Sequence, residues 1–149
     1  MHKIGWKEWV CLPELGLKSV KAKIDTGART SALHTFEIEP KTRRGRDYIR
    51  FRIHPLQHNN ELVVEHEALI KDRRIVRDSG GHEEERYVIE TPLQIGDLQF
   101  PIELTLTNRE DMLFRMLLGR TALKAGKLMV NPAATYLSGK RFKPARKPR

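Results

Sequence analysis

The chain has 149 residues, a formal net charge of +9 at pH 7 and one cysteine, Cys11. This length predicts a single domain that buries its own core. The sequence has no apolar stretch of membrane-spanning length and no basic, apolar leader, so we expect a soluble protein with no signal peptide and no membrane partner. One cysteine excludes an intrachain disulfide within these residues, which fits the reducing cytoplasm, the location that we predict.

Much of the positive charge lies at the C-terminal end. We expect residues 138–149 to form a disordered basic tail after a domain that covers residues 1–137. Nucleic-acid binding is the weaker interpretation of this tail, because neither stacking aromatic residues nor a nucleic-acid motif accompanies the charge. The tail contains no acidic residue, and its basic residues are Lys140, Arg141, Lys143, Arg146, Lys147 and Arg149.

Most of the chain consists of short segments with alternating apolar and polar residues, separated by turns that contain Gly, Pro or Asp. Such segments are typical of strands, and many of them in succession predict an all-β barrel or sandwich. One short helix is expected over 120–124, and a charged loop tip is expected around Gly45. The segments expected to be extended are 6–12, 17–24, 32–40, 48–53, 63–70, 74–76, 86–89, 92–95, 100–106 and 127–130.

One turn places a carboxylate directly after a predicted strand. Residues 20–24 alternate in polarity, and the chain then continues as Asp25-Thr26-Gly27-Ala28-Arg29. A carboxylate at the end of a half-buried strand is costly unless it is hydrogen-bonded. Because Asp, Thr and Gly are also common turn formers, this tripeptide alone favours an ordinary strand-to-turn junction.

A second stretch changes that interpretation. Met116-Leu117-Leu118-Gly119-Arg120 is an apolar run that ends in Gly and Arg. With the Asp25 turn before it, the sequence resembles the retropepsin-like aspartic proteases. The resemblance in most detail is to the bacterial RimB-like family formerly labelled ATP-dependent zinc proteases, and it covers residues 6–136. It implies a single-lobe, closed β-barrel with one short helix, acting as a cytoplasmic peptide hydrolase.

The resemblance also implies roles for individual residues. Asp25 is the expected catalytic acid and base, Thr26 is expected to brace the turn, and Gly27 is expected to let a substrate backbone approach. One carboxylate cannot both activate water and protonate a leaving amine, whereas two that share a proton can. The other candidate turn, Asp78-Ser79-Gly80, follows Arg77, where a buried strand would be expected, so we do not predict that it supplies the second carboxylate. We therefore predict a homodimer in which each copy contributes one Asp25.

The substrate is expected to bind as an extended peptide between the Asp25 turn and a flap. Ala28 and Arg29 are the predicted substrate-binding residues of the turn, and Ser79, Gly80 and Gly81 are those of the flap tip, which would equally suit a plain flexible hairpin. Arg29 departs from the retroviral enzymes, which have Asp at this position to pair with the later Arg. Arg120 therefore needs another partner.

The former family label is not supported by any motif. There is no His-Glu-x-x-His and no Gly-rich phosphate loop, so we expect neither metal nor ATP as a cofactor. We interpret the histidines as ordinary surface or loop residues; they are His34, His54, His58, His66 and His82.

Arginines near the presumed flap suggest an acidic substrate, such as a glutamate-tailed ribosomal protein, because the family is associated with glutamate ligases. An equal interpretation is that these arginines belong to a solvent-exposed face, where neighbouring glutamates balance their charge. The arginines are Arg29, Arg73, Arg74, Arg77 and Arg86. Two alternatives to the peptidase remain: a non-catalytic β-barrel that binds peptides, and a ribosome- or RNA-associated protein that binds through its tail.

Overall fold

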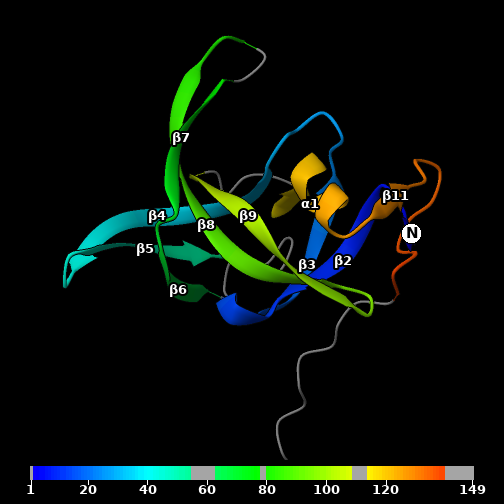
Figure 1. Ribbon diagram of the computed structural model, residues 1–149, viewed down its shortest axis with the longest axis horizontal. Helices are drawn as coiled ribbons and strands as arrows, with labels where there is room; N and C mark the ends of the chain where they lie inside the picture. The colour runs from blue at the N-terminus through cyan, green and yellow to red at the C-terminus, as the bar shows by residue number, and fades with distance from the viewer. Residues whose placement is uncertain (1, 55–62, 78–79, 109–113, 140–149) are drawn as a thin grey trace, which may run out of the picture.

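The computed structural model describes residues 2–54, 63–77, 80–108 and 114–139 (Figure 1). His58, Asp78, Ser79 and residues 140–149 lie outside the described part of the chain. Over the described ranges, no helix is both long and apolar enough to cross a membrane.

Strands make up most of the described chain, with one short α-helix. A short 3-10 helix, η1 (Pro13–Leu15), ends at Gly16 in the left-handed conformation. The other elements are β1 (His2–Ile4), β2 (Lys7–Leu12), β3 (Leu17–Ile24), β4 (Ser31–Arg43), β5 (Arg46–Ile53), β6 (Val64–Leu69), β7 (Asp72–Arg77), β8 (Glu83–Ile95), β9 (Leu98–Asn108), β10 (Met116–Leu118), α1 (Arg120–Ala125) and β11 (Leu128–Val130).

The main sheet has the order β10-β3-β2-β8-β9-β4-β5-β6, and β7 pairs with β8 outside this path. Because β10 pairs with both β3 and β4, six strands form a ring in which each is hydrogen-bonded to the next. In order, they are β10, β3, β2, β8, β9 and β4. Strands β1 and β11 form a separate parallel pair. The prediction of a mostly β chain with one short α-helix is confirmed for the described residues, and the narrower one of a closed barrel stays a prediction.

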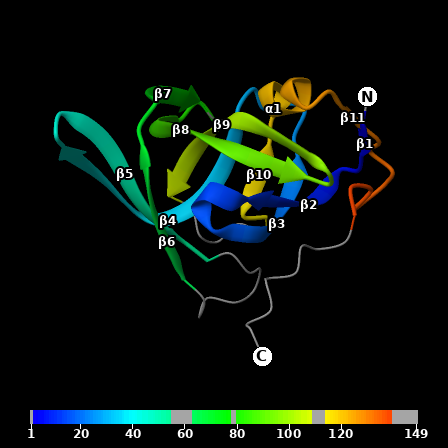
Figure 2. The ribbon, with the colours of Figure 1, turned by 60° about the horizontal axis from the view of Figure 1, so that its bottom comes forward.

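The core is built by the inward-facing residues of strands that alternate in polarity. On β5, Ile49, Phe51 and Ile53 are buried, whereas Arg50 and Arg52 between them are only partly covered. Strand side chains point alternately to opposite faces, so this alternation directs one face inward. Two hairpins project from this body. The β4–β5 hairpin extends outward in Figures 1 and 2, and Figure 1 shows the β7–β8 arm, in which residues 72–77 pair with residues 83–88.

A buried carboxylate fastens the C-terminal segment to the sheet. Glu8 on β2 is fully buried, and its oxygens accept hydrogen bonds from the backbone amides of Gly5, Leu137 and Ser138, at 2.6, 2.8 and 3.0 Å. The Ser138 hydroxyl donates to the same carboxylate. These donors compensate for the loss of water around the buried group.

We expect Glu8→Gln to lower the free energy of unfolding by about 2 kcal/mol, because the new amide NH₂ would face backbone donors instead of accepting from them. Urea denaturation of the full chain measures this change. Glu14→Gln is the control, since Glu14 is exposed on η1 and makes no ion pair within the described residues. Equal stability of the two variants would contradict a role for Glu8 as an anchor.

Candidate active site

The Asp25 turn follows β3 and is held from below by β10. Strand β10 pairs in parallel with β3 and antiparallel with β4, so it lies between the strand that leads into the turn and the strand that leaves it. The backbone amide of Asp25 donates to the carbonyl of Leu118 at 2.9 Å. Since Leu118 is fully buried, the turn rests on the core of the sheet.

Within the turn, the carboxylate is oriented by a short internal hydrogen bond. The Gly27 amide donates to Asp25 Oδ1 at 2.9 Å, and the Ala28 amide donates to the Asp25 carbonyl at 3.2 Å. Asp25 is half-buried, whereas Thr26 and Gly27 are exposed. The other carboxylate oxygen accepts no hydrogen bond from the described residues, so it is available to water, to a substrate or to a second carboxyl group.

Gly119 allows β10 and α1 to lie directly against the turn. A Cβ atom at this position would lie 2.7 Å from the carbonyl carbon of Thr30 and 2.8 Å from its oxygen. The Gly119 amide donates to the Ser31 hydroxyl at 3.0 Å, and this bond is buried. Ser31 was assigned no role from the sequence, because a serine at the start of a strand gives no signal of a partner 88 residues away.

The first residues of α1 complete the support of the turn. The amides of Arg120 and Thr121 donate to the carbonyls of Ala28 and Arg29, at 2.8 and 3.0 Å. The Arg120 guanidinium donates to the Thr26 carbonyl at 3.1 Å. In place of the acidic side chain of the retroviral enzymes, Arg120 therefore binds the backbone of the Asp25 turn.

A cleft of about 440 Å³ lies between the Asp25 turn and the β7–β8 arm. One wall comes from the turn, the other comes from the arm, and the floor includes residues of β4, β9 and β10. A volume of this size is in the range of ligand clefts. The lining residues are Gly27, Ala28, Arg29, Thr30, Ala32, Arg74, Ile75, Val76, Arg77, Arg86, Thr105 and Leu117.

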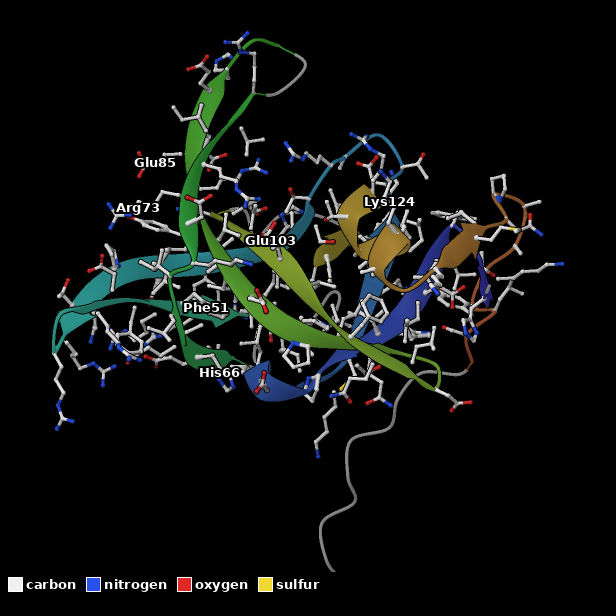
Figure 3. The ribbon with its side chains drawn as sticks, viewed as in Figure 1. Phe51, His66, Arg73, Glu85, Glu103 and Lys124 are labelled. Atoms are coloured by element: carbon white, nitrogen blue, oxygen red, sulfur yellow. The ribbon has the colours of Figure 1, made fainter. Side chains whose placement is uncertain are left out.

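The arginines of the cleft differ in their partners. Arg74 is bound to Glu103 at 3.0 Å and to Asp72 at 2.8 Å, and the Arg74 guanidinium is the main reason that the pKa of Glu103 is lowered. Glu103 lies on β9 near the base of the arm (Figure 3). Arg77 pairs with Glu83, whereas the exposed Arg29 makes no ion pair with any described residue. Arg29 is therefore the least compensated cation of this cleft.

The predicted substrate-binding residues are only partly brought together. Ala28 and Arg29 line the cleft. Gly80 and Gly81 are exposed on the β7–β8 arm and do not line it, and Ser79 lies outside the described residues. The arm contributes instead through its paired strands, with residues 74–77 of β7 and with Arg86 of β8.

The interpretation of the histidines as surface or loop residues is wrong for His34, whereas His54 lies in a loop but is not at the surface. His34 is buried because β4 lies between β9 and β10, and it hydrogen-bonds to the Thr107 hydroxyl at 2.6 Å. His54 is also buried, stacked on Phe36 with 4.3 Å between ring centroids. Within the described ranges, no three His, Cys, Asp or Glu residues gather in a way that would hold a metal ion.

The RimB-like family, described as retropepsin-like aspartic endopeptidase RimB, matches residues 3–141. The chain belongs to this family. The resemblance inferred from Asp25-Thr26-Gly27 and from the Gly119 segment is thereby confirmed.

Curated relatives of this family member carry a different name. Proteins called probable alpha-L-glutamate ligase are 41% identical in Shewanella pealeana over 138 residues and 45% identical in Parasynechococcus marenigrum over 136 residues. These matches cover 93% and 91% of this chain, but only 30% and 29% of the relatives. The chain thus spans about three-tenths of the length of these curated relatives.

A solved structure has the same fold. It belongs to a Legionella pneumophila protein of unknown function, with a TM-score of 0.76 and 27% sequence identity. The alignment covers 92% of this chain and 98% of that one.

Proposed function

We propose that this family member is an aspartic endopeptidase whose active unit is a symmetric homodimer. The observation that carries the proposal is the Asp25 carboxylate, which is oriented by the Gly27 amide, half-buried and adjacent to a cleft. Hydrolysis needs one group to remove a proton from water and another to protonate the leaving nitrogen. A second copy, placed across a two-fold axis, supplies the second carboxyl group.

In the proposed reaction, water attacks the carbonyl carbon of a peptide bond while the ionised Asp25 accepts its proton. The protonated Asp25 of the second copy donates to the nitrogen as the C–N bond breaks. Two nearby carboxyl groups cannot both ionise easily, which keeps one proton on the pair, as is well established for aspartic proteases in general. The products are one carboxylic acid and one amine, so atoms balance with water as the only co-reactant.

The proposed substrate is an acidic peptide rich in glutamate, and a glutamate-tailed ribosomal protein fits this description. Two observations support it. The cleft contains Arg29, which has no ion-pair partner among the described residues, and Arg77 and Arg86 lie opposite on the arm. The curated relatives are named as glutamate ligases. Guanidinium groups bind carboxylates through paired, charge-assisted hydrogen bonds, so these arginines suit a glutamate chain.

We expect Arg29→Ala to lower kcat/KM for an α-linked oligo-glutamate peptide by about fivefold, the size of one exposed ion pair. A neutral peptide of the same length should be cleaved equally by both proteins. Lys18→Ala is the matched control, because Lys18 is an exposed cation outside the cleft. Equal loss on both peptides would overturn the acidic specificity, while cleavage itself would still support the peptidase.

The relatives' name favours a second candidate function, a module that binds glutamate-rich peptides without cleaving them. Such a module could hold the substrate or product of a ligase. Isothermal titration with the same oligo-glutamate peptide tests it: binding without any cleavage by the unmodified chain would favour this candidate over the peptidase.

A further inference from the structure

The outer end of the β4–β5 hairpin carries a cluster of basic residues far from the Asp25 turn. We call residues 41–48 the hairpin tip. The chain reverses at Arg44 and Gly45, which have φ values of 52° and 76°, and Arg43 pairs directly with Arg46 across the ladder. Figures 1 and 2 both show this hairpin extending away from the rest of the sheet.

The charges of the tip are not arranged for stability. Like charges directly opposite each other on paired strands are destabilising, and Arg43 and Arg46 occupy such positions. Arg43 pairs with Glu67 on β6. Neither Arg44 nor Arg46, both exposed, forms an ion pair with a described residue.

The shaft of the same hairpin shows the opposite arrangement. Arg50 pairs with Glu39 and with Glu65, and Arg52 pairs with Glu37 at 2.9 Å and with Glu65 at 3.5 Å. Acidic neighbours therefore neutralise the arginines close to the body, whereas the tip retains its positive charge.

The tip also surrounds a hollow of about 540 Å³, lined by Arg43, Arg44, Arg46 and Tyr48. The Arg43 guanidinium lies 5.1 Å from the centroid of the Tyr48 ring. Next to it, the Thr42 hydroxyl donates to Asp47 Oδ1 at 2.9 Å. The hollow thus combines flat cationic groups with an aromatic ring, and a hydrogen-bond acceptor lies beside it.

We propose that the hairpin tip docks single-stranded RNA. Guanidinium groups bind phosphates, and unpaired bases stack on aromatic rings or on guanidinium planes. A purely acidic protein partner would use the charge but not the ring of Tyr48. The Asp47 carboxylate would repel a phosphate but can accept from a ribose 2′-hydroxyl, which DNA lacks. The proposal concerns a surface apart from the cleft and does not rest on the peptidase activity.

Fluorescence anisotropy of the full chain with a labelled single-stranded RNA of about twelve nucleotides tests this proposal. The key variant is Arg44→Gln/Arg46→Gln, and the control is Lys18→Gln/Lys124→Gln, which removes the same charge from exposed positions elsewhere. Every protein keeps the C-terminal segment, so its contribution is common to all measurements. Titrations from about 50 to about 200 mM salt give the salt slope of log K.

We expect the tip variant to bind RNA at least about tenfold more weakly and to reduce the salt slope by about 1.4, which corresponds to two lost phosphate contacts on a single strand. Tyr48→Leu should weaken binding about fivefold without changing the slope, because it removes stacking and no charge. The Lys18/Lys124 control should lose clearly less affinity than the tip variant.

Three results would overturn the proposal. Equal loss of affinity in the tip variant and in the control would show that only total charge matters. Equally tight binding of DNA with the same sequence would show that the ribose 2′-hydroxyl is not recognised. Tip-dependent binding of an oligo-glutamate peptide as tight as that of the RNA would assign the surface to an acidic protein instead.

Discussion

Asp25→Asn should reduce peptide cleavage by at least about 10²–10⁴-fold, the usual contribution of a general acid or base. Asn has almost the same shape as Asp, and its carbonyl oxygen can still accept the hydrogen bond from the Gly27 amide. Its amide cannot take a proton from water or share one with a second carboxyl group. The expected loss is therefore one of chemistry, with folding unchanged. Mass-spectrometric detection of products from the oligo-glutamate peptide measures the effect.

Thermal unfolding of the same variant provides the control, because a melting temperature near that of the unmodified protein excludes misfolding as the cause. Activity of the unmodified chain should also persist with a metal chelator and without ATP. Wild-type turnover by Asp25→Asn would refute the proposed role of Asp25, and chelator-sensitive activity that zinc restores would point to a metallopeptidase.

Gly119→Ala should lower the free energy of unfolding by about 3 kcal/mol, at the upper end of the cost of overpacking. The added methyl group would lie 2.7 Å from the Thr30 carbonyl carbon, which is backbone and cannot rotate away. Relief of this overlap requires the Asp25 turn and β10 to move apart. Peptide cleavage should therefore fall as well, even at temperatures where the variant remains folded.

The matched control is Gly45→Ala, which makes the same chemical change at the tip of the β4–β5 hairpin. Nothing lies within 4 Å of a Cβ atom there, and the residue has a positive φ of 76°. Only backbone strain of about 1–2 kcal/mol is expected, with no loss of cleavage. Urea denaturation gives both values, and an equal effect of the two substitutions would contradict the close packing at Gly119.

Local patterns were sufficient to predict the strands that alternate most clearly. The predicted strand 17–24 matches β3 (Leu17–Ile24), because its apolar positions face the core and a Gly-containing segment bounds each end. The pattern did not predict β1 (His2–Ile4), a strand of three residues. Its pairing partner, β11, lies at the other end of the chain, and such a contact leaves no periodic signal.

In the candidate site, too, local motifs predicted individual residues, whereas contacts between segments distant in the sequence could not be predicted. Asp25, Thr26 and Gly27 were identified from a motif, and the apolar segment before Gly119 was recognised beside it. The partner of Arg120 could not be predicted, because it is a backbone carbonyl, which every residue carries. Thr105 and Val76 enter the cleft from distant strands, so their place depends on the sheet order. His34 was misassigned because a polar residue suggests exposure, whereas β4 is covered at that point.

In the proposed homodimer, two copies of Asp25 form one active site. Two differently tagged chains, one unmodified and one Asp25→Asn, can be co-expressed and purified through both tags to isolate the mixed dimer. If the pair of carboxyl groups is shared, the mixed dimer should be as inactive as the Asp25→Asn homodimer. If each chain works alone, the mixed dimer would keep about half of the wild-type activity, and this result would contradict the shared site.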